Sequence, residues 1–439
     1  MWAMLQRLQK AIIRAGLFIN TIIQEIFYLC IAEFERGLKT VKKSTGIQLA
    51  LLSLVPFIMV LGNSMLIPVL PRIKESLRIS QFWVSLLITA FSIPAGLVIP
   101  LAGMLSDQIG RKKVMAPALI IYGMGGVVAG LSSVFSENPY WGILAGRMIQ
   151  GIGAGGTYQL AMAVVGDTFS SEERSKALGL LEASNGLGKV VSPILGAGLA
   201  MIAWFFPFFA YGILAIPVGI ILYFFIDEKE EFKKQSIKDY IRAIKAIFKR
   251  KAAGLLSSFF DGMTALFSLF GILSLYSDIL EKNYHLFGLK KGLIISGPVF
   301  AMALLSFILG ILLEKWKNKG LKIFILAGLA LLASGHLMFS LVEEFWMLFI
   351  SVLILGIGVG LIMTPVNALV TGSCSVKRRG IITCLYGSLR FFGVAVAPPV
   401  YAFSERYGIK TVVLAAGAIS LVAFVFTGIF VVPKKILSS

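Results

Sequence analysis

Charged side chains are scarce in this chain. They make up 14% of the 439 residues, against 57% hydrophobic residues, and the mean hydropathy is +0.88. Soluble domains ordinarily carry about 25% charged residues. The shortage excludes a soluble globular fold, and we expect an integral membrane protein.

Histidine and cysteine are nearly absent as well. The chain has two histidines and three cysteines, Cys30, Cys374 and Cys384, and none of the spacings suits a metal ion. An odd number of cysteines, two of them in or beside apolar segments, is typical of small buried thiols. The sequence also lacks a Walker A loop, an H-E-x-x-H pair and a G-x-S-x-G turn. We therefore expect no metal, no cofactor and no enzyme activity.

Long apolar runs fill most of the remaining sequence. A bilayer core of roughly 30 Å needs about 20 apolar residues per helix. Twelve such runs lie near 47–70, 81–103, 114–135, 141–166, 178–201, 204–226, 252–279, 291–313, 321–342, 346–370, 380–403 and 408–432. They predict an all-α integral membrane protein of twelve transmembrane helices, in two pseudo-symmetric six-helix lobes over 47–226 and 252–432.

Two segments outside these runs show amphipathic helical spacing. In residues 1–46 the apolar positions recur with a helical period, and charged residues lie on the opposite side. We expect an interfacial helix on the cytoplasmic leaflet there; the alternative, a span over 16–32, would bury Glu25. The linker 227–251 has a similar apolar stripe amid lysines, and a short tail occupies 433–439.

The net charge of +19 is concentrated in alternate connections between the runs. Lysine and arginine crowd 1–46, 111–113, 227–251, 315–322, 377–379 and 434–435, whereas 136–140, 202–203 and 343–345 carry none. This is the positive-inside pattern, which predicts that both termini and the central linker are cytoplasmic. The basic excess then faces anionic lipid and not nucleic acid. No Asn-x-Ser/Thr sequon occurs, which fits a bacterial inner or plasma membrane.

One short pattern occurs twice, about half the chain apart. Residues 103–113 read GMLSDQIGRKK and residues 310–319 read GILLEKWKNK. A glycine ladder follows each copy, GIGAG at 151–155 and GIGVG at 356–360. Two copies of one half, each with a basic turn and then closely spaced glycines, indicate a two-lobed membrane transporter.

The first copy resembles the signature loop of the major facilitator superfamily. Its pattern of glycine, acid, glycine and basic residues lies between the second and third apolar runs, where that family has it. The resemblance implies that the loop acts as a latch between the lobes. The implied latch residues are Gly103, Asp107, Gly110 and Arg111, with Glu314 as the acid of the second copy.

Further motifs are similar to those of the twelve-span drug–proton antiporter branch of that family. Arg147 and Gln150 match a fourth-span motif whose arginine takes part in proton coupling, and Asn63-x4-Pro68-x2-Pro71 matches the end of the first span. The fifth span resembles the branch's antiporter motif, with Ser192 in place of one glycine. For packing or hinge positions we take Gly151, Gly155, Gly188, Pro193, Gly196, Gly356, Gly360 and Pro399.

Five charged side chains lie inside apolar runs: Arg147, Glu182, Lys189, Asp261 and Arg390. Each costs roughly 2.5–3.5 kcal/mol at mid-bilayer, so we expect them to pair or to line an aqueous cavity. Counting about 1.5 Å per residue places Lys189, Asp261 and Arg390 near the midplane. Asp261 and Glu182 are the predicted proton carriers.

Together these features predict a secondary active transporter that works by alternating access. The first interpretation is proton-coupled efflux of amphipathic small molecules, of the multidrug type. The alternatives are export or flipping of an anionic amphiphile such as a lipid precursor, and proton-coupled uptake. The expected partners are the substrate, protons and the lipid bilayer, and we expect a monomer.

Overall fold

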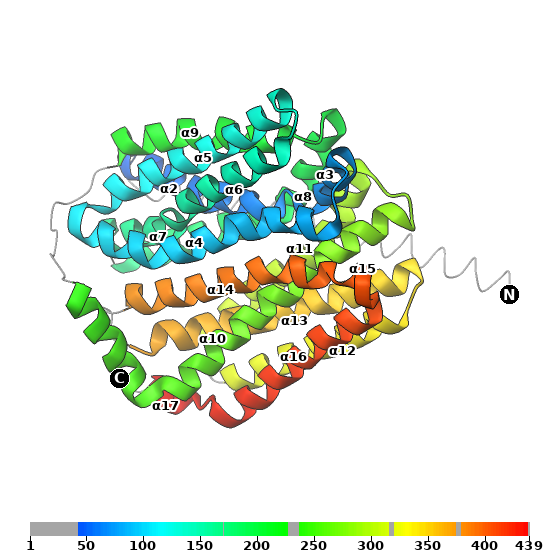
Figure 1. Cartoon of the computed structure of the whole chain (residues 1–439). Helices are drawn as coiled ribbons and strands as arrows, with labels where there is room; N and C mark the ends of the chain where they lie inside the picture. Colours follow the sequence, from blue (N-terminus) through cyan, green and yellow to red (C-terminus); the bar gives the residue numbers. More distant parts are fainter. Residues whose placement is uncertain (1–42, 170, 227–236, 316–319, 375–378, 438–439) are drawn as a thin grey trace.

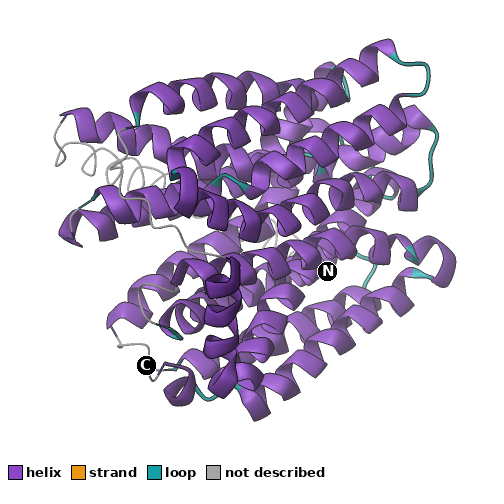
Figure 2. Ribbon diagram, turned by 60° about the vertical axis from the view of Figure 1, so that its left-hand side comes forward, coloured by secondary structure: helices purple, strands orange, loops and turns teal. Residues whose placement is uncertain are grey.

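The computed structural model describes residues 43–169, 171–226, 237–315, 320–374 and 379–437. The amphipathic helix predicted within 1–46 and the first part of the linker lie outside these ranges. Within them the structure is helical and contains no strand (Figure 2). The multi-pass membrane architecture expected from the sequence is confirmed.

The described residues of the first half form eight α-helices and one short 3-10 helix. They are α2 (Lys43–Ser64), η1 (Ile67–Val69), α3 (Leu70–Leu77), α4 (Gln81–Ile109), α5 (Arg111–Phe135), α6 (Pro139–Gly155), α7 (Tyr158–Thr168), α8 (Ser171–Ile202) and α9 (Phe206–Phe225).

The second half again consists of helices. They are α10 (Ile237–Lys282), α11 (Gly288–Lys315), α12 (Leu321–Leu341), α13 (Phe345–Gly372), α14 (Arg379–Ala402), α15 (Ser404–Tyr407), α16 (Ile409–Phe430) and α17 (Pro433–Leu437).

Eleven helices of the described residues are long and apolar enough to cross a membrane. The run predicted over 141–166 is not one helix, because α6 ends at Gly155 and α7 begins at Tyr158. Thr157 between them leaves the helical region, with φ −114° and ψ −83°. Glycine costs about 1 kcal/mol relative to alanine inside a helix, so the glycine-rich end of α6 weakens continuity there. Together α6 and α7 supply the twelfth span.

The described part of the linker also differs from expectation. It does not end before a separate seventh span, because α10 runs for 46 residues from Ile237 to Lys282 without interruption. Neither glycine nor proline occurs between Ile237 and Ala253, so nothing in the sequence breaks the helix. The expected boundary at residue 251 therefore lies inside one helix.

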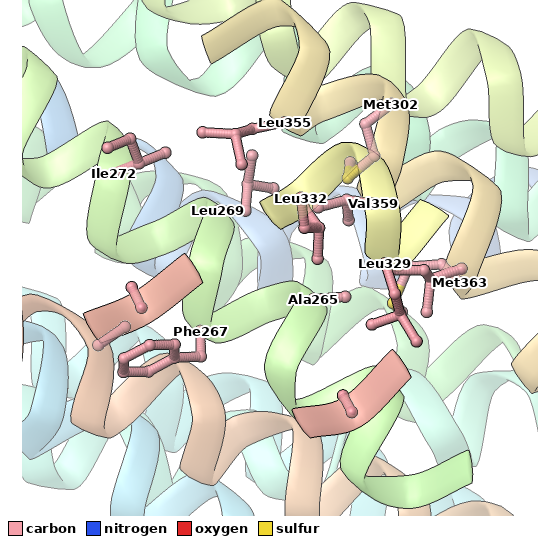
Figure 3. Packing of buried hydrophobic residues seen from close by; sticks show 14 of the residues in the cluster. Ala265, Phe267, Leu269, Ile272, Met302, Leu329, Leu332, Leu355, Val359 and Met363 are labelled. Atoms are coloured by element: carbon pink, nitrogen blue, oxygen red, sulfur yellow. The ribbon is translucent and has the colours of Figure 1, made fainter. Parts of the chain in front are cut away.

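Buried apolar residues form two clusters, and each is drawn almost entirely from one half of the chain. In Figure 1, α5, α6 and α9 lie on one side, α12, α13 and α16 on the other, and α4 faces α14 between them. Figure 3 shows part of the second cluster, where Ala265 and Leu269 of α10 meet Leu332 and Val359. The two halves join along the pairs α4–α14 and α8–α11.

Equivalent glycines pack in equivalent ways in the two halves. A Cβ on Gly151 of α6 would overlap the carbonyl oxygen of Phe91 in α4, and one on Gly356 of α13 would overlap that of Pro298 in α11. One turn on, a Cβ on Gly155 would lie 2.9 Å from the Ala95 oxygen, and a Cβ on Gly360 would lie 2.8 Å from the Met302 oxygen. The repeated glycine ladder thus lets the same two helices of each half approach closely.

The helical bundle has two ends. We call them the terminal end and the distal end. At the terminal end α2 begins and α17 ends; at the distal end lie α3, α15 and the 283–287 connection. Distal contacts join the halves directly: Lys74 Nζ lies 2.6 Å from Glu405 Oε1, and Ser277 Oγ donates to the Ile67 oxygen at 3.0 Å.

Candidate functional site

Three of the five predicted charges meet where the halves face each other. Glu182 and Lys189 come from α8 of the first half, and Arg390 comes from α14 of the second. Lys189 lies within electrostatic range of both Glu182 and Arg390. Tyr158 of α7 completes the group, since its hydroxyl donates to Glu182 Oε1 at 2.5 Å. We call these four residues the central cluster.

The spacing of residues along each helix and the packing between helices determine where these side chains point. Glu182 and Lys189 are seven residues apart, two turns along one face of α8. Gly188 packs against Phe57 of α2, which fixes the rotation of α8 about its axis. On α14, Arg390 stacks over the ring of Tyr386, 5.3 Å from its centroid.

The side chains of the central cluster are not sealed inside the protein. Glu182 is exposed, and Tyr158, Lys189 and Arg390 are partly exposed, although all four belong to spanning helices. Two cations thus lie near one carboxylate where the halves meet. The cations can bind an anionic group through charge-assisted hydrogen bonds, and the carboxylate can bind a proton or a cation.

The structure does not bring Arg147 into this cluster. Its side chain is fully buried inside the first half, where it donates to the oxygens of Leu87 at 3.0 Å and Gly62 at 2.8 Å. It also donates to Asn63 Oδ1 and Gln150 Oε1, both at 2.5 Å. Carbonyl and amide oxygens therefore satisfy this guanidinium, which binds α2, α4 and α6 together.

Asp261 lies apart from the cluster too. It is fully buried in the second half, and its two carboxylate oxygens accept from Thr427 Oγ1 of α16 at 2.8 and 2.7 Å. Tyr386 lies within electrostatic range of both Asp261 and Arg390, so one aromatic ring separates Asp261 from the central cluster. The prediction that Asp261 lines the same site as Lys189 and Arg390 is therefore wrong, because its side chain turns toward α16.

The signature loop makes ion pairs within the first half. Arg111 lies 3.7 Å from Asp107 and 2.7 Å from Asp167 of α7. Gly110 has φ 112°, a backbone conformation that favours glycine at this turn. Toward the second half, a Cβ on Gly103 would lie 3.1 Å from the Cys384 sulfur. The side chain of Glu314 lies outside the described residues.

The remaining predicted packing positions lie on α8 and α14. Gly196 of α8 touches the Met65 backbone, and the Pro193 oxygen faces Gly292 of α11 at the junction of the halves. Pro399 lies inside α14.

Sequence reasoning missed the tyrosines of the site, Tyr158 and Tyr386, and the partner Thr427. Polar side chains one or two turns from a buried charge are the signal that could have found them: Tyr386 precedes Arg390 by four residues. His336 is fully buried between the Leu332 oxygen and the Tyr401 hydroxyl, 2.7 Å from each.

Solved structures with the same fold include two transporters. The chain is 16% identical to a bacterial homologue of the human lysosomal transporter Spinster in an inward-facing, occupied conformation, with a TM-score of 0.74 over 91% of this chain and 99% of that one. It is 19% identical to the human organic anion transporter MFSD10, with a TM-score of 0.66 over 86% and 98%.

Two relatives of known sequence are named as an exporter and an efflux protein. The chain is 39% identical to the bacillibactin exporter of Bacillus subtilis (strain 168) over 354 residues, 80% of this chain and 88% of that protein. It is 26% identical to the multidrug efflux protein YfmO of the same organism, over 84% of this chain and 88% of that one. The Major Facilitator Superfamily model matches residues 52–398 and 290–437. The chain therefore belongs to the Major Facilitator Superfamily and is a secondary membrane transporter, not an enzyme.

Proposed function

We propose that this transporter exports an amphipathic small molecule that carries negative charge, by alternating access of its two halves around the central cluster. The observation that carries this proposal is the pairing of Lys189 and Arg390, one from each half, against the single carboxylate of Glu182. An anion held between the two cations touches both halves at once. Its binding can therefore bias their relative position.

The surroundings of the two cations suit an amphipathic molecule. Tyr158 and Tyr386 present aromatic rings beside the charges, and the ring of Phe391 on α14 contacts that of Phe91, 6.3 Å away. A ligand with an anionic group and an apolar body finds both kinds of partner here. Because a relative is named for the export of bacillibactin, bacillibactin is the first substrate to test.

We place the terminal end in the cytoplasm, because the basic turn Arg111–Lys113 and the tail residues Lys434 and Lys435 lie there. An anion leaving a cell with a negative interior moves along the electrical force. Moving one negative charge out of the cell releases about 2.3 kcal/mol of free energy per 100 mV of membrane potential. The membrane potential can thus drive export of an anion directly.

Transport into inside-out membrane vesicles tests the proposal. We expect labelled bacillibactin to accumulate when the vesicle interior is made electrically positive, and Lys189→Ala and Arg390→Ala to lower the initial rate at least tenfold. Lys290→Ala is the matched control, since this exposed lysine of α11 lies at the distal end. Wild-type rates in both cluster variants, or an equal loss in the control, would refute the assignment.

A second candidate is efflux of cationic drugs in exchange for protons. The observation that favours it is the exposed carboxylate of Glu182, held by Tyr158. A proton and a cation compete for such a carboxylate, which is the requirement for exchange. Glu182→Gln separates the two candidates: it should abolish pH-driven efflux of a cationic dye under the second and leave anion export intact under the first.

A further inference from the structure

The repeat in the sequence allows a direct comparison of the two junctions between the halves. Gly103 of α4 and Gly310 of α11 begin the two copies of the repeated pattern, so they are equivalent positions. Helix α4 packs against α14 at the first junction, and α11 packs against α8 at the second. If the halves were equally close at both junctions, the two glycines would have similar neighbours in the opposite half.

The α4–α14 junction is closed along most of its length. Near the distal end Thr89 Oγ1 donates to a backbone oxygen of α14 at 2.6 Å. Seven residues further along α4, the Gly96 oxygen accepts from Ser388 Oγ. After seven more residues, a Cβ on Gly103 would lie 3.1 Å from the Cys384 sulfur. Contacts seven residues apart lie on one face of α4, so this face touches α14 over about 21 Å at 1.5 Å per residue.

The α8–α11 junction is closed in its distal part. A Cβ on Gly292 of α11 would lie 2.8 Å from the Pro193 oxygen of α8. One turn on, Ser296 Oγ donates to a backbone oxygen of α8 at 2.8 Å. Toward the terminal end the helices are further apart, since a Cβ on Gly186 would lie 4.0 Å from the Cβ of Ala303.

Two turns beyond that contact α8 and α11 have separated. Gly179 precedes Gly186 by seven residues and Gly310 follows Ala303 by seven, so each continues the face that makes the contact. Both glycines are exposed, and no described atom outside the surrounding helical turns lies within 4 Å of a Cβ added at either one. At the equivalent position, Gly103 touches α14. The terminal end is therefore open on one side, between Gly179 and Gly310, and we call this space the side opening.

The side opening leads to the central cluster. Gly186 lies between Glu182 and Lys189 along α8, so the cluster lies at the level where the two helices begin to separate. Glu182 is exposed and Lys189 is partly exposed. On α11 the exposed residues near the opening are apolar: Phe307 is 62% exposed and Ile311 is 54% exposed. A molecule in the opening thus meets apolar side chains of α11 and charged groups of α8.

We propose that the substrate enters the transporter sideways, from the lipid leaflet at the terminal end, through the side opening. The burial of apolar groups concentrates an amphipathic molecule in the bilayer. Its apolar body can remain against lipid and α11 while its anionic group reaches Lys189. The α4–α14 junction offers no such route, because its helices stay in contact. This inference rests on the proposed export of an anionic amphiphile and adds the place from which the substrate is taken.

Spin labelling tests the side opening without any substrate. A label is attached to Gly310→Cys in a protein whose native cysteines are replaced by serine, and the protein is reconstituted into liposomes. Leu293→Cys is the matched control, because Leu293 is 58% exposed and each position lies five residues from an end of α11. We expect molecular oxygen, which dissolves in lipid, to relax the two labels within twofold of each other. An effect at position 310 at least fivefold weaker would overturn the proposal, since lipid would not reach this face of α11.

Photochemical capture tests whether the substrate uses the side opening. Benzoylphenylalanine is placed at position 310, or at position 293 as the control, and inside-out vesicles are irradiated with labelled bacillibactin. We expect at least tenfold more label on the protein at position 310, and Lys189→Ala should abolish this excess. Equal capture at both positions, or no capture at 310 in vesicles that transport bacillibactin, would overturn the route. Vesicles that do not transport bacillibactin would contradict the proposed substrate, whereas the oxygen measurement would still decide whether the side opening exists.

Discussion

The buried guanidinium of Arg147 gives the sharpest test of the difference between a structural and a functional charge. We expect Arg147→Ala to destabilise the first half. The substitution removes the guanidinium N–H groups that donate to Asn63 Oδ1 and Gln150 Oε1. At about 1–3 kcal/mol for each orphaned buried acceptor, the loss is about 2–6 kcal/mol. The Gly62 oxygen is less affected, since it also accepts from Tyr211 Oη at 3.1 Å.

Thermal unfolding of the detergent-solubilised protein, followed with a thiol-reactive dye, measures this loss. Lys189→Ala is the comparison, because Lys189 is partly exposed and its neighbour Glu182 is exposed, so its removal leaves no buried acceptor unpaired. We expect Arg147→Ala to melt several degrees lower than Lys189→Ala. Coupling between Arg147→Ala and Asn63→Ala would confirm that the loss arises at this contact. An Arg147→Ala protein that melts with the wild type would refute the structural role.

Three further outcomes follow from the packing between and within the halves. Gly196→Val should prevent stable folding, because its Cβ would overlap the Met65 backbone; a monodisperse variant of wild-type melting temperature would contradict this. Glu405→Ala removes the distal ion pair with Lys74, an exposed pair worth up to about 1 kcal/mol, so labelling of a cysteine placed at the distal end should quicken by up to about fivefold. Asp107→Ala should speed modification of the native thiol of Cys384 by a membrane-permeant reagent, and an unchanged rate would argue against a latch in this loop.

The fold could be predicted from the sequence because lipid imposes a strong constraint on composition. Helices that cross a bilayer must be long and apolar, and the repeated glycine ladders fix which helices of each half approach closely. The break at Thr157 could not be predicted in the same way, since several glycines in a row weaken a helix without specifying where it ends. That break also hid Tyr158 from sequence reasoning.

The central cluster could be predicted in part. Glu182 and Lys189 lie on one helix, so their common face follows from the number of residues between them. The meeting of Lys189 with Arg390 required only a similar depth in the membrane and two helices of opposite halves. Depth was not sufficient for Arg147 and Asp261, because their partners include backbone oxygens and a threonine hydroxyl that carry no charge and leave no distinctive pattern.

Arg390 stands between two charges that respond to different ligands. A substrate anion adds negative charge on the side of Lys189, and a proton at Asp261 removes negative charge beyond Tyr386. Because both would act on one guanidinium, we expect a proton at Asp261 to strengthen anion binding in the central cluster. Proton binding and anion binding would then favour each other. In exchange the coupling is the opposite, because one ligand displaces the other. External acid should therefore slow release of an anion at the distal side, whereas it would displace a cation held by Glu182. We therefore expect the charge of the transported molecule to decide whether the pH gradient or the membrane potential drives export.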